Sequence, residues 1–326
     1  MGRIAVSEYA AENRAEWEAF VDNSNNGGMF HKQAFLDYHA PGRFDFTHLL
    51  FRDEYGKLIA VLPGGFKEGG RVYWSPVGAS YGSLVSGDIA FGDALEVVDA
   101  MLEYFRSRGT EEIFLIPPPL IYSKVYNQHL EYAMLYRKFD FENHYISHAV
   151  DLTPGVNTYM TFDLKAQKTI SKIRREGVIV VKESDNFEEY YPILEENKLK
   201  HGVKPTHSLE DLNRLKTLTP NNIKLLTVYK DEEPVAGSML FLVNDKVSLC
   251  FYVMMKYEHR ALRPVFLALD ESIRWSAAKG YEWFDIGVSQ DTAAEDPMTP
   301  ALSLIYFKER FNARGIFRST YHLKLK

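Results

Sequence analysis

The sequence predicts an α/β protein with α+β character that contains two tandem copies of one domain, each a mixed sheet flanked by helices. Three observations carry this prediction: the length of the chain, an order of helices and strands that occurs twice, and a glycine that ends one helix in each copy. At 326 residues, the chain is long enough for two domains of ordinary size. Its 46% hydrophobic and 25% charged residues are typical of a globular protein with packed cores.

Each copy contains a predicted β-hairpin followed by a third strand. Apolar residues flank a polar turn over 47–61 and again over 224–237, which predicts two strands and a tight connection in each place. The runs 71–77 and 246–254 are rich in β-branched and aromatic residues, so we expect a third strand there. Two helical stretches precede each hairpin, at 10–23 and 32–39 in the first copy and at 187–200 and 208–218 in the second.

A helix and a further strand complete each copy. Apolar residues recur with helical spacing over 94–108 and 265–279, and Gly109 and Gly280 follow where left-handed C-terminal caps are expected. The strands after these glycines are predicted at 112–116 and 283–287. The order helix, helix, hairpin, strand, helix, strand therefore occurs twice, as expected of a duplicated domain.

Charge and cysteine content argue against several classes of protein. A formal net charge of −6 is the opposite of what a protein that coats DNA needs, so we expect no DNA partner. Cys250 is the only cysteine and lies in an apolar run, which predicts a buried thiol and no disulfide within the chain. Neither a signal peptide nor a membrane span of ~18 apolar residues is present. We expect a cytoplasmic protein that is not integral to a membrane, with peripheral membrane contact left open.

Motifs of other enzyme classes do not occur. The sequence contains no phosphate loop of an NTPase, no nucleophile elbow and no dinucleotide fingerprint. His201, His207 and His259 lack the paired spacing of a zinc site, and no cysteine accompanies them. We therefore expect no metal.

Three passages carry a resemblance to a known family. They are His201–Leu212, the run Arg260–Gly287 that ends in Tyr-Glu-Trp-Phe-Asp-Ile-Gly, and Leu304–Asn312 with the sequence Leu-Ile-Tyr-Phe-Lys-Glu-Arg-Phe-Asn. Together with the order of elements, they resemble the GNAT acyltransferase fold, duplicated as in the Fem family of peptidoglycan-bridge aminoacyltransferases and their FemAB-like relatives. The resemblance covers nearly the whole chain. It implies a first domain at 1–160, a second at 161–315 that carries the active cleft, and a final strand at 316–325 that packs on the first domain.

A basic segment leads into the second domain. Lys165, Lys168, Lys172 and Arg175 are spaced three or four residues apart on a predicted helix and so share one face. Such a face suits phosphates, and the resemblance implies a place beside the cleft that receives a nucleotide-linked precursor or a tRNA donor. The alternative is a solvated helix face, which is a common fate of a charge run.

The loop before the last long helix departs from the usual GNAT pattern. A typical GNAT enzyme holds the diphosphate of acyl-CoA with backbone N–H groups of a glycine-containing loop at this point. The matching residues, Glu258–Pro264, contain neither glycine, and Pro264 lacks an N–H. Either the side chains of Arg260 and Arg263 bind the phosphates, or the donor is not a coenzyme A thioester, which we favour slightly. Pro264 is also simply a favourable first residue of a helix, with the arginines as surface charges.

Candidate catalytic residues also lie in the second copy. The resemblance implies that Lys308 lies at the site of acyl transfer, where an ammonium could stabilise a developing oxyanion; a surface lysine of an amphipathic helix explains it equally well. Asp285, at the end of a predicted strand, and Tyr252 and Glu258 are the further candidates for proton transfer. Asp285 could instead cap a turn, and an aromatic residue such as Tyr252 is more often part of a core.

The resemblance implies an acyl- or aminoacyltransferase that acts on an amine, with a cell-envelope precursor as one expected acceptor. The donor would be acyl-CoA or aminoacyl-tRNA, with no further cofactor; the lack of a long helical arm argues against the tRNA reaction. Two alternatives stay open: an acetyl-CoA-dependent N-acetyltransferase, and a duplicated fold that has lost catalysis and binds a ligand or partner. Because Pro117–Pro119 caps the corresponding place in the first copy, we expect any chemistry in the second.

Overall fold

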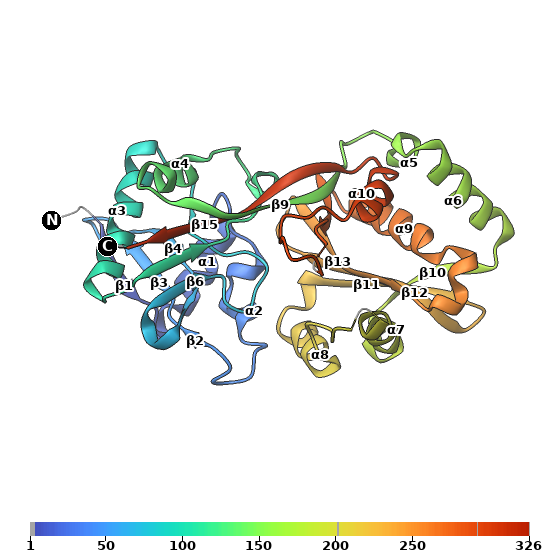
Figure 1. Cartoon of the computed structure of the whole chain (residues 1–326), viewed down its shortest axis with the longest axis horizontal. Helices are drawn as coiled ribbons and strands as arrows, with labels where there is room; N and C mark the ends of the chain where they lie inside the picture. The colour runs from blue at the N-terminus through green and yellow to red at the C-terminus, as the bar shows by residue number, and fades with distance from the viewer. Residues whose placement is uncertain (1–3, 201, 292, 326) are drawn as a thin grey trace. The chain divides into compact units, whose positions relative to one another are not determined.

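The structure is a computed structural model that describes residues 4–200, 202–291 and 293–325 (Figure 1). The chain forms two compact units, Met1–Tyr145 with Phe317–Lys326 and Ile146–Ile316. Strands β9 (Asp140–Asp151) and β15 (Arg314–Lys324) each begin in one unit and end in the other. The second unit thus begins before the expected residue 161, because the last residues of β9 pair with a strand of that unit.

The first unit contains two sheets. One has the strand order β1-β3-β4-β7, and the other has the order β9-β15-β8-β6-β5-β2. Tyr321 of β15 pairs with Leu115 of β8 in antiparallel fashion, so the end of the chain belongs to the first unit. The remaining strands are β1 (Ala5–Glu8), β2 (Asp45–Phe46), β3 (Leu49–Arg52), β4 (Leu58–Leu62), β5 (Gly65–Lys67), β6 (Val72–Ser75), β7 (Val85–Ser86) and β8 (Glu112–Leu115).

The core of the first unit is built around its longest helix. The helices are α1 (Arg14–Asn23), α2 (Gln33–Leu36), α3 (Phe91–Ser107) and α4 (His129–Tyr136). The apolar stripe that the sequence places on α3 is fully buried, with Val97, Met101 and Phe105 at 0% exposure. Phe105 packs against Tyr73 of β6, with ring centroids 4.4 Å apart. The helical spacing of apolar residues therefore identified the buried face correctly.

The second unit has one sheet with the strand order β10-β11-β12-β13-β14-β9. Its strands are β10 (Ile179–Ser184), β11 (Ile223–Lys230), β12 (Glu233–Leu242), β13 (Val247–Met255) and β14 (Trp283–Val288). The helices are α5 (Thr158–Thr161), α6 (Leu164–Glu176), α7 (Phe187–Lys200), α8 (Leu209–Leu218), α9 (Pro264–Ala278) and α10 (Leu302–Glu309). Helices α6 and α9 lie on one side of this sheet and α7 and α8 on the other (Figure 1).

The predicted repeat is present in the structure. Each unit has a hairpin, a third strand, a long helix and a strand that pairs in parallel with the third strand. Gly109 and Gly280 follow α3 and α9 with φ of 73° and 87°, the left-handed conformation that glycine adopts without strain. The α/β class and the duplication are therefore confirmed.

The two parallel pairs differ in length. In the first unit, β6 and β8 pair along all four residues of each strand, from Val72 with Glu112 to Ser75 with Leu115. In the second unit, β13 has nine residues but pairs with β14 only from Val247 to Leu249. Only the second unit therefore has a parallel pair that separates within the length of its strands.

Candidate functional site

The separation of β13 and β14 defines the first part of the candidate site. Leu249 and Asp285 form the last pair, and beyond them the two strands diverge; we call this point the strand fork. The pairing of β13 with β12 is also irregular here, because Met239 pairs with Tyr252 and Leu240 with Cys250, which leaves Phe251 as an extra residue. A bulge of this kind bends a strand and interrupts its ladder of hydrogen bonds. Ligands in α/β proteins bind at the carboxyl ends of parallel strands, and the fork lies at such ends.

Asp285 is fully buried at the strand fork. Its Oδ1 atom accepts hydrogen bonds from Ser147 Oγ at 2.8 Å and from the backbone N–H of Gly287 at 2.7 Å. Asp285 lies at the last pair with β13 but is the third of the six residues of β14, so it does not lie at the end of the strand as expected. Its carboxylate binds the backbone two residues further on. A carboxylate at 0% exposure with these partners is suited to holding the backbone.

Lys308 projects from α10 and is 3% exposed. Its Nζ donates hydrogen bonds to the carbonyl oxygens of Gly287 at 2.7 Å and Val288 at 2.8 Å, and to Ser289 Oγ at 2.9 Å. Burial lowers the pKa of Lys308 to about 8, although the nearby Asp285 opposes this shift. Lys308 is therefore no surface lysine; it is a buried ammonium that binds the end of β14.

Two further polar residues near Lys308, Ser289 and His148, were not predicted from the sequence. Ser289 Oγ lies 2.8 Å from His148 Nδ1, and both residues are buried. Burial, and then the positive charge of Lys308, lower the pKa of His148. His148 lies on β9 and Ser289 just after β14, so only the pairing of these strands reveals the cluster. No spacing in the sequence joins them.

Tyr252 lies apart from these contacts. Its hydroxyl is 3.1 Å from His207 Nδ1, and burial raises the pKa of the phenol. Both residues are 3% exposed, so this contact fastens the segment between α7 and α8 to the sheet. His207 thus joins this segment to β13 through the hydroxyl of Tyr252. His201 lies outside the described residues.

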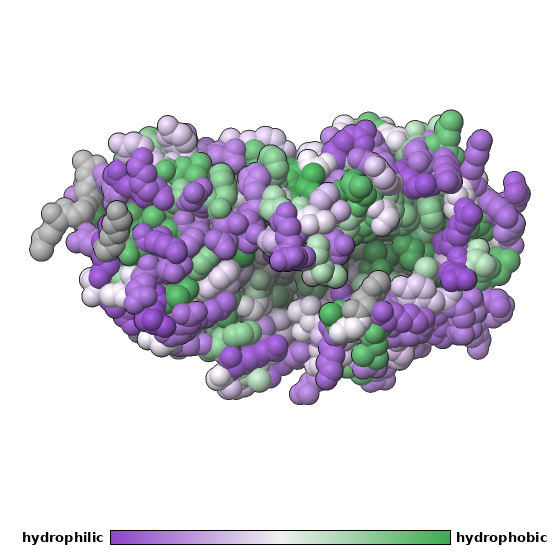
Figure 2. Space-filling view, in the orientation of Figure 1, coloured by the Kyte–Doolittle hydropathy of each residue, from purple (hydrophilic) through white to green (hydrophobic). Residues whose placement is uncertain are grey.

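A pocket of about 540 Å³ beside α6 forms the second part of the candidate site. Lys165, Lys168 and Lys172 line it from α6, and Arg263 lines it from the start of α9; we call it the basic pocket. Glu176 is the one acidic residue of its lining. Apolar residues of α6, β10 and the 3-10 helix η6 (Tyr257–Leu262) complete the wall. Figure 2 shows hydrophilic residues gathered where α6 lies in Figure 1.

The sequence of α6 explains why its lysines face the pocket. Asp163 caps the helix by accepting from the N–H of Ala166, and Gly177 ends it with φ of 64°. Ile170 and Ile173 are buried beneath it, while Arg174 pairs with the buried carboxylate of Asp270 on α9 at 2.6 Å. The basic face is therefore directed outward, as the three-and-four spacing predicts.

Of the three arginines that the sequence analysis selected, only one lines the basic pocket. Arg263 has φ of 53° and precedes Pro264, the first residue of α9, and its guanidinium donates to Thr169 Oγ1 at 3.3 Å. Arg175 and Arg260 are exposed and do not line the basic pocket. Arg263 and the three lysines thus come together, whereas Arg175 and Arg260 stand outside.

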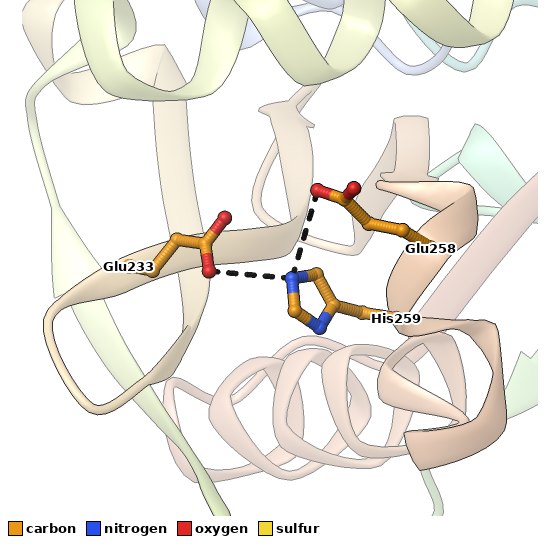
Figure 3. Close-up of side chains that lie close together, drawn as sticks. All are labelled: Glu233, Glu258 and His259. Atoms are coloured by element: carbon orange, nitrogen blue, oxygen red, sulfur yellow. Dashed lines mark ion pairs between the residues drawn. The ribbon is translucent and has the colours of Figure 1, made fainter.

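An ion-pair cluster holds η6 next to the basic pocket (Figure 3). His259 Nε2 is 3.3 Å from Glu233 and 3.8 Å from Glu258, and Lys256 Nζ is 2.6 Å from Glu233. The hydrogen bond from Lys256 lowers the pKa of Glu233. One ligand atom each of Glu233, Glu258 and His259 could approach a metal ion together. Lys256 already forms an ion pair with Glu233, however, and both carboxylates are exposed. The cluster links η6 to the start of β12. Glu258 takes part in it and does not reach the strand fork as a base.

Part of the second unit is similar in sequence to a known family of domains. Residues 165–295 match the family model described as an acetyltransferase (GNAT) domain. These residues include the strand fork and all of the basic pocket's lining except Leu164, whereas His148 and Lys308 lie outside the match. No curated protein matches the chain in sequence.

Solved structures extend the similarity to both units. FemX has a TM-score of 0.71 at 10% identity, over 98% of this chain and 97% of its own. The chain has a tandem GNAT fold. The C-terminal domain of a putative lysylphosphatidylglycerol synthetase from Agrobacterium fabrum is similar at a TM-score of 0.59 and 13% identity, over 96% of this chain and 92% of its own. A tandem GNAT protein from the clavulanic acid biosynthesis pathway has a TM-score of 0.56 at 11% identity, with 98% of each chain covered.

In the tandem GNAT fold, the candidate site belongs to the second GNAT domain. The acetyltransferase description fits the predicted class of enzyme, an acyltransferase. None of the helices in the described part of the chain combines the length and apolar character of a membrane span.

Proposed function

We propose that the protein is an N-acyltransferase that takes its acyl group from a phosphate-bearing thioester donor, acyl-CoA, and transfers it to an amine. The observation that carries the proposal is that one GNAT domain contains both a basic pocket at the start of α9 and a parallel strand pair that diverges. The pocket supplies four cationic side chains against one carboxylate. That balance suits a diphosphate with a further phosphate group.

The distance between the two parts of the site supports a donor with a long arm. From Leu249 at the strand fork to Met255, β13 runs six residues, which is roughly 20 Å at about 3.3 Å per residue. η6 and the basic pocket follow directly along the chain. A donor bound by its phosphates must therefore carry its reactive carbonyl on an extended arm, as the pantetheine arm of acyl-CoA does. In aminoacyl-tRNA the acyl ester lies one nucleoside from the nearest phosphate, which fits this spacing less well.

Arginine and lysine side chains take the place of the glycine loop in this proposal. Arg263 adopts a left-handed conformation that a GNAT loop usually gives to glycine, and Pro264 supplies no N–H. The guanidinium of Arg263 and the ammonium groups of α6 would bind the phosphates in place of backbone donors. Arg260 is exposed beside this loop and is left free to contact the outer part of the donor.

Acyl transfer at the strand fork needs little from titrating side chains. The neutral amine forms the new C–N bond, the C–S bond breaks, and the proton of the amine passes to the thiolate or to solvent. The interrupted ladder at Phe251 would supply a backbone N–H for the oxyanion. Asp285 and Lys308 are committed to the backbone of β14 and would act by holding it.

For the acceptor, we propose an amine of a cell-envelope precursor, handled in the cytoplasm. The fold similarity to FemX and to a lysylphosphatidylglycerol synthetase domain supports this class. If this acceptor is linked to a nucleotide, it would carry phosphate groups in addition to those of the donor.

Thermal shift measurements test the donor. Wild-type protein is melted with coenzyme A, with acetyl-CoA and with an aminoacyl-tRNA; a ligand at 100 times its Kd stabilises the folded protein by about 2.7 kcal/mol. We expect stabilisation by both coenzyme A compounds, lost in Lys165→Ala/Lys168→Ala and kept in the matched surface variant Lys57→Ala. Stabilisation by aminoacyl-tRNA alone would replace acyl-CoA as the donor, and no response to any donor would favour a binding protein without catalysis.

A further inference from the structure

The last residues of β14 have an unusual backbone. Relative to β9, Asp285 pairs with Ala149 and Val288 with Ser147, so β14 has one residue more than its partner over this stretch. Gly287 lies within the stretch and has φ of 79°, a conformation that side chains other than glycine rarely adopt. The strand therefore bends directly after the strand fork.

Two buried charged side chains bind the backbone of this bend. The carboxylate of Asp285 accepts the N–H of Gly287, while Lys308 Nζ donates to the carbonyl oxygens of Gly287 and Val288. In an ordinary sheet, a neighbouring strand would donate to carbonyl groups at these positions. Here a side chain from α10 takes that place, 2.7 and 2.8 Å from the two oxygens.

Every N–H of the Lys308 ammonium has a partner. An ammonium has three donors, and Gly287, Val288 and Ser289 accept them. Ser289 is itself held by His148 at 2.8 Å. With these contacts in place, Lys308 has no donor left for an oxyanion, so its contribution runs through the backbone of β14.

We propose that Lys308 is a positioning residue that binds the two carbonyl groups after the strand fork and so keeps β14 from continuing its ladder along β13. The divergence that results gives the arm of the donor its place. The inference rests on the proposed function only for the identity of that arm; the contacts of Lys308 stand without it.

We call the hydrogen bonds of Lys308 Nζ to Gly287, Val288 and Ser289 the clamp. Loss of the clamp would destabilise the end of β14. Without Nζ, the carbonyl groups of Gly287 and Val288 would lose their donors in a partly buried place, where unpaired carbonyls are unfavourable. The segment would then shift toward the N–H groups that β13 offers at its bulge. The shift would narrow the strand fork while leaving the basic pocket, which shares no residue with it, unchanged.

The test compares two ligands and three variants. The nucleotide 3′,5′-ADP carries the 3′-phosphate and the first of the two 5′-phosphates of coenzyme A without the arm, so it reports the basic pocket alone. Lys308→Met removes the clamp, and Ser289→Ala removes one of its three contacts without leaving a buried charge unpaired. Leu215→Ala is the matched control, because it creates a cavity under α8 in the same unit, away from β14.

Calorimetry and hydrogen exchange give the readouts. We expect coenzyme A to bind wild type at least tenfold more tightly than 3′,5′-ADP, and Lys308→Met to abolish this difference while binding 3′,5′-ADP unchanged. The amides of 285–290 should exchange at least tenfold faster in Lys308→Met, less so in Ser289→Ala, and as in wild type in Leu215→Ala. If Lys308→Met fails to fold, the test rests on Ser289→Ala, in which the difference between the affinities for coenzyme A and 3′,5′-ADP should be partly lost.

Two results would overturn the positioning role: unchanged exchange of 285–290 in both clamp variants, or loss of coenzyme A and 3′,5′-ADP binding to the same degree. If neither nucleotide binds wild type, the proposed donor is wrong, and the exchange measurement still decides whether Lys308 holds β14.

Discussion

Replacing Lys308 with Met should change how the stability of the second unit depends on pH. The pKa of Lys308 falls from the usual 10.5 to about 8 because the ammonium is buried. Between these values the unfolded chain binds more protons than the folded chain, so the free energy of unfolding rises with pH. A difference of about 2.5 pKa units corresponds to roughly 3.4 kcal/mol, which is gained as pH rises through this range and is complete only above pH 10.5.

The measurement uses the chain's single cysteine. Cys250 is 4% exposed in the second unit, so the fraction that reacts in a brief pulse of thiol reagent reports unfolding of that unit in urea. Wild type and Lys308→Met are unfolded at pH 7, 8, 9 and 10, and the difference between their free energies of unfolding cancels the other titrating groups. We expect this difference to grow in favour of wild type by about 2–3 kcal/mol from pH 7 to pH 10. A difference that stays constant would show that Lys308 is not a desolvated ammonium and would refute the reasoning.

Further changes test the fold and the histidines. Gly109→Ala and Gly280→Ala should each lower the free energy of unfolding by about 1 kcal/mol, because both glycines have positive φ in open surroundings; urea unfolding that matches wild type would contradict the assigned caps. Asp270→Asn should loosen α6 and weaken binding of 3′,5′-ADP several-fold, because Asp270 pairs with Arg174 of that helix. If calorimetry finds the same affinity as in wild type, the packing of α6 on α9 does not control binding in the basic pocket. Burial lowers the pKa of His31 and of His48 to about 4, so the first unit should lose stability as pH falls from 6.5 to 4, by up to about 3.4 kcal/mol for each histidine; an acid titration of His31→Gln by circular dichroism should show a shallower loss, and a profile like that of wild type would count against it.

The fold was largely predictable because the chain's local patterns agree with its tertiary structure. The apolar stripe of α3 and the glycines after α3 and α9 are dictated by helical periodicity and by left-handed caps. The boundary between the units was less predictable. β9 contributes residues to both units, and nothing in its sequence marks the change at residue 146.

The candidate site was predictable only where its residues share one element. The spacing predicted that Lys165, Lys168, Lys172 and Arg175 share one face of α6. The three lysines line the basic pocket and Arg175 does not, and the structure adds Arg263 from another element. The contacts of Lys308 with β14 could not be predicted, because they join backbone groups 21 and 20 residues away. His148 and Ser289 lie on different elements and carry no motif, so only strand pairing brings them together.

The most direct test of the account is a calorimetric titration of the wild-type protein with acetyl-CoA at low and high salt. The account predicts binding that weakens as salt rises, because charged side chains hold the phosphates, and that weakens about tenfold, or 1.4 kcal/mol, in Lys165→Ala/Lys168→Ala. Binding that is indifferent to salt and to these lysines, or the absence of binding, would contradict it.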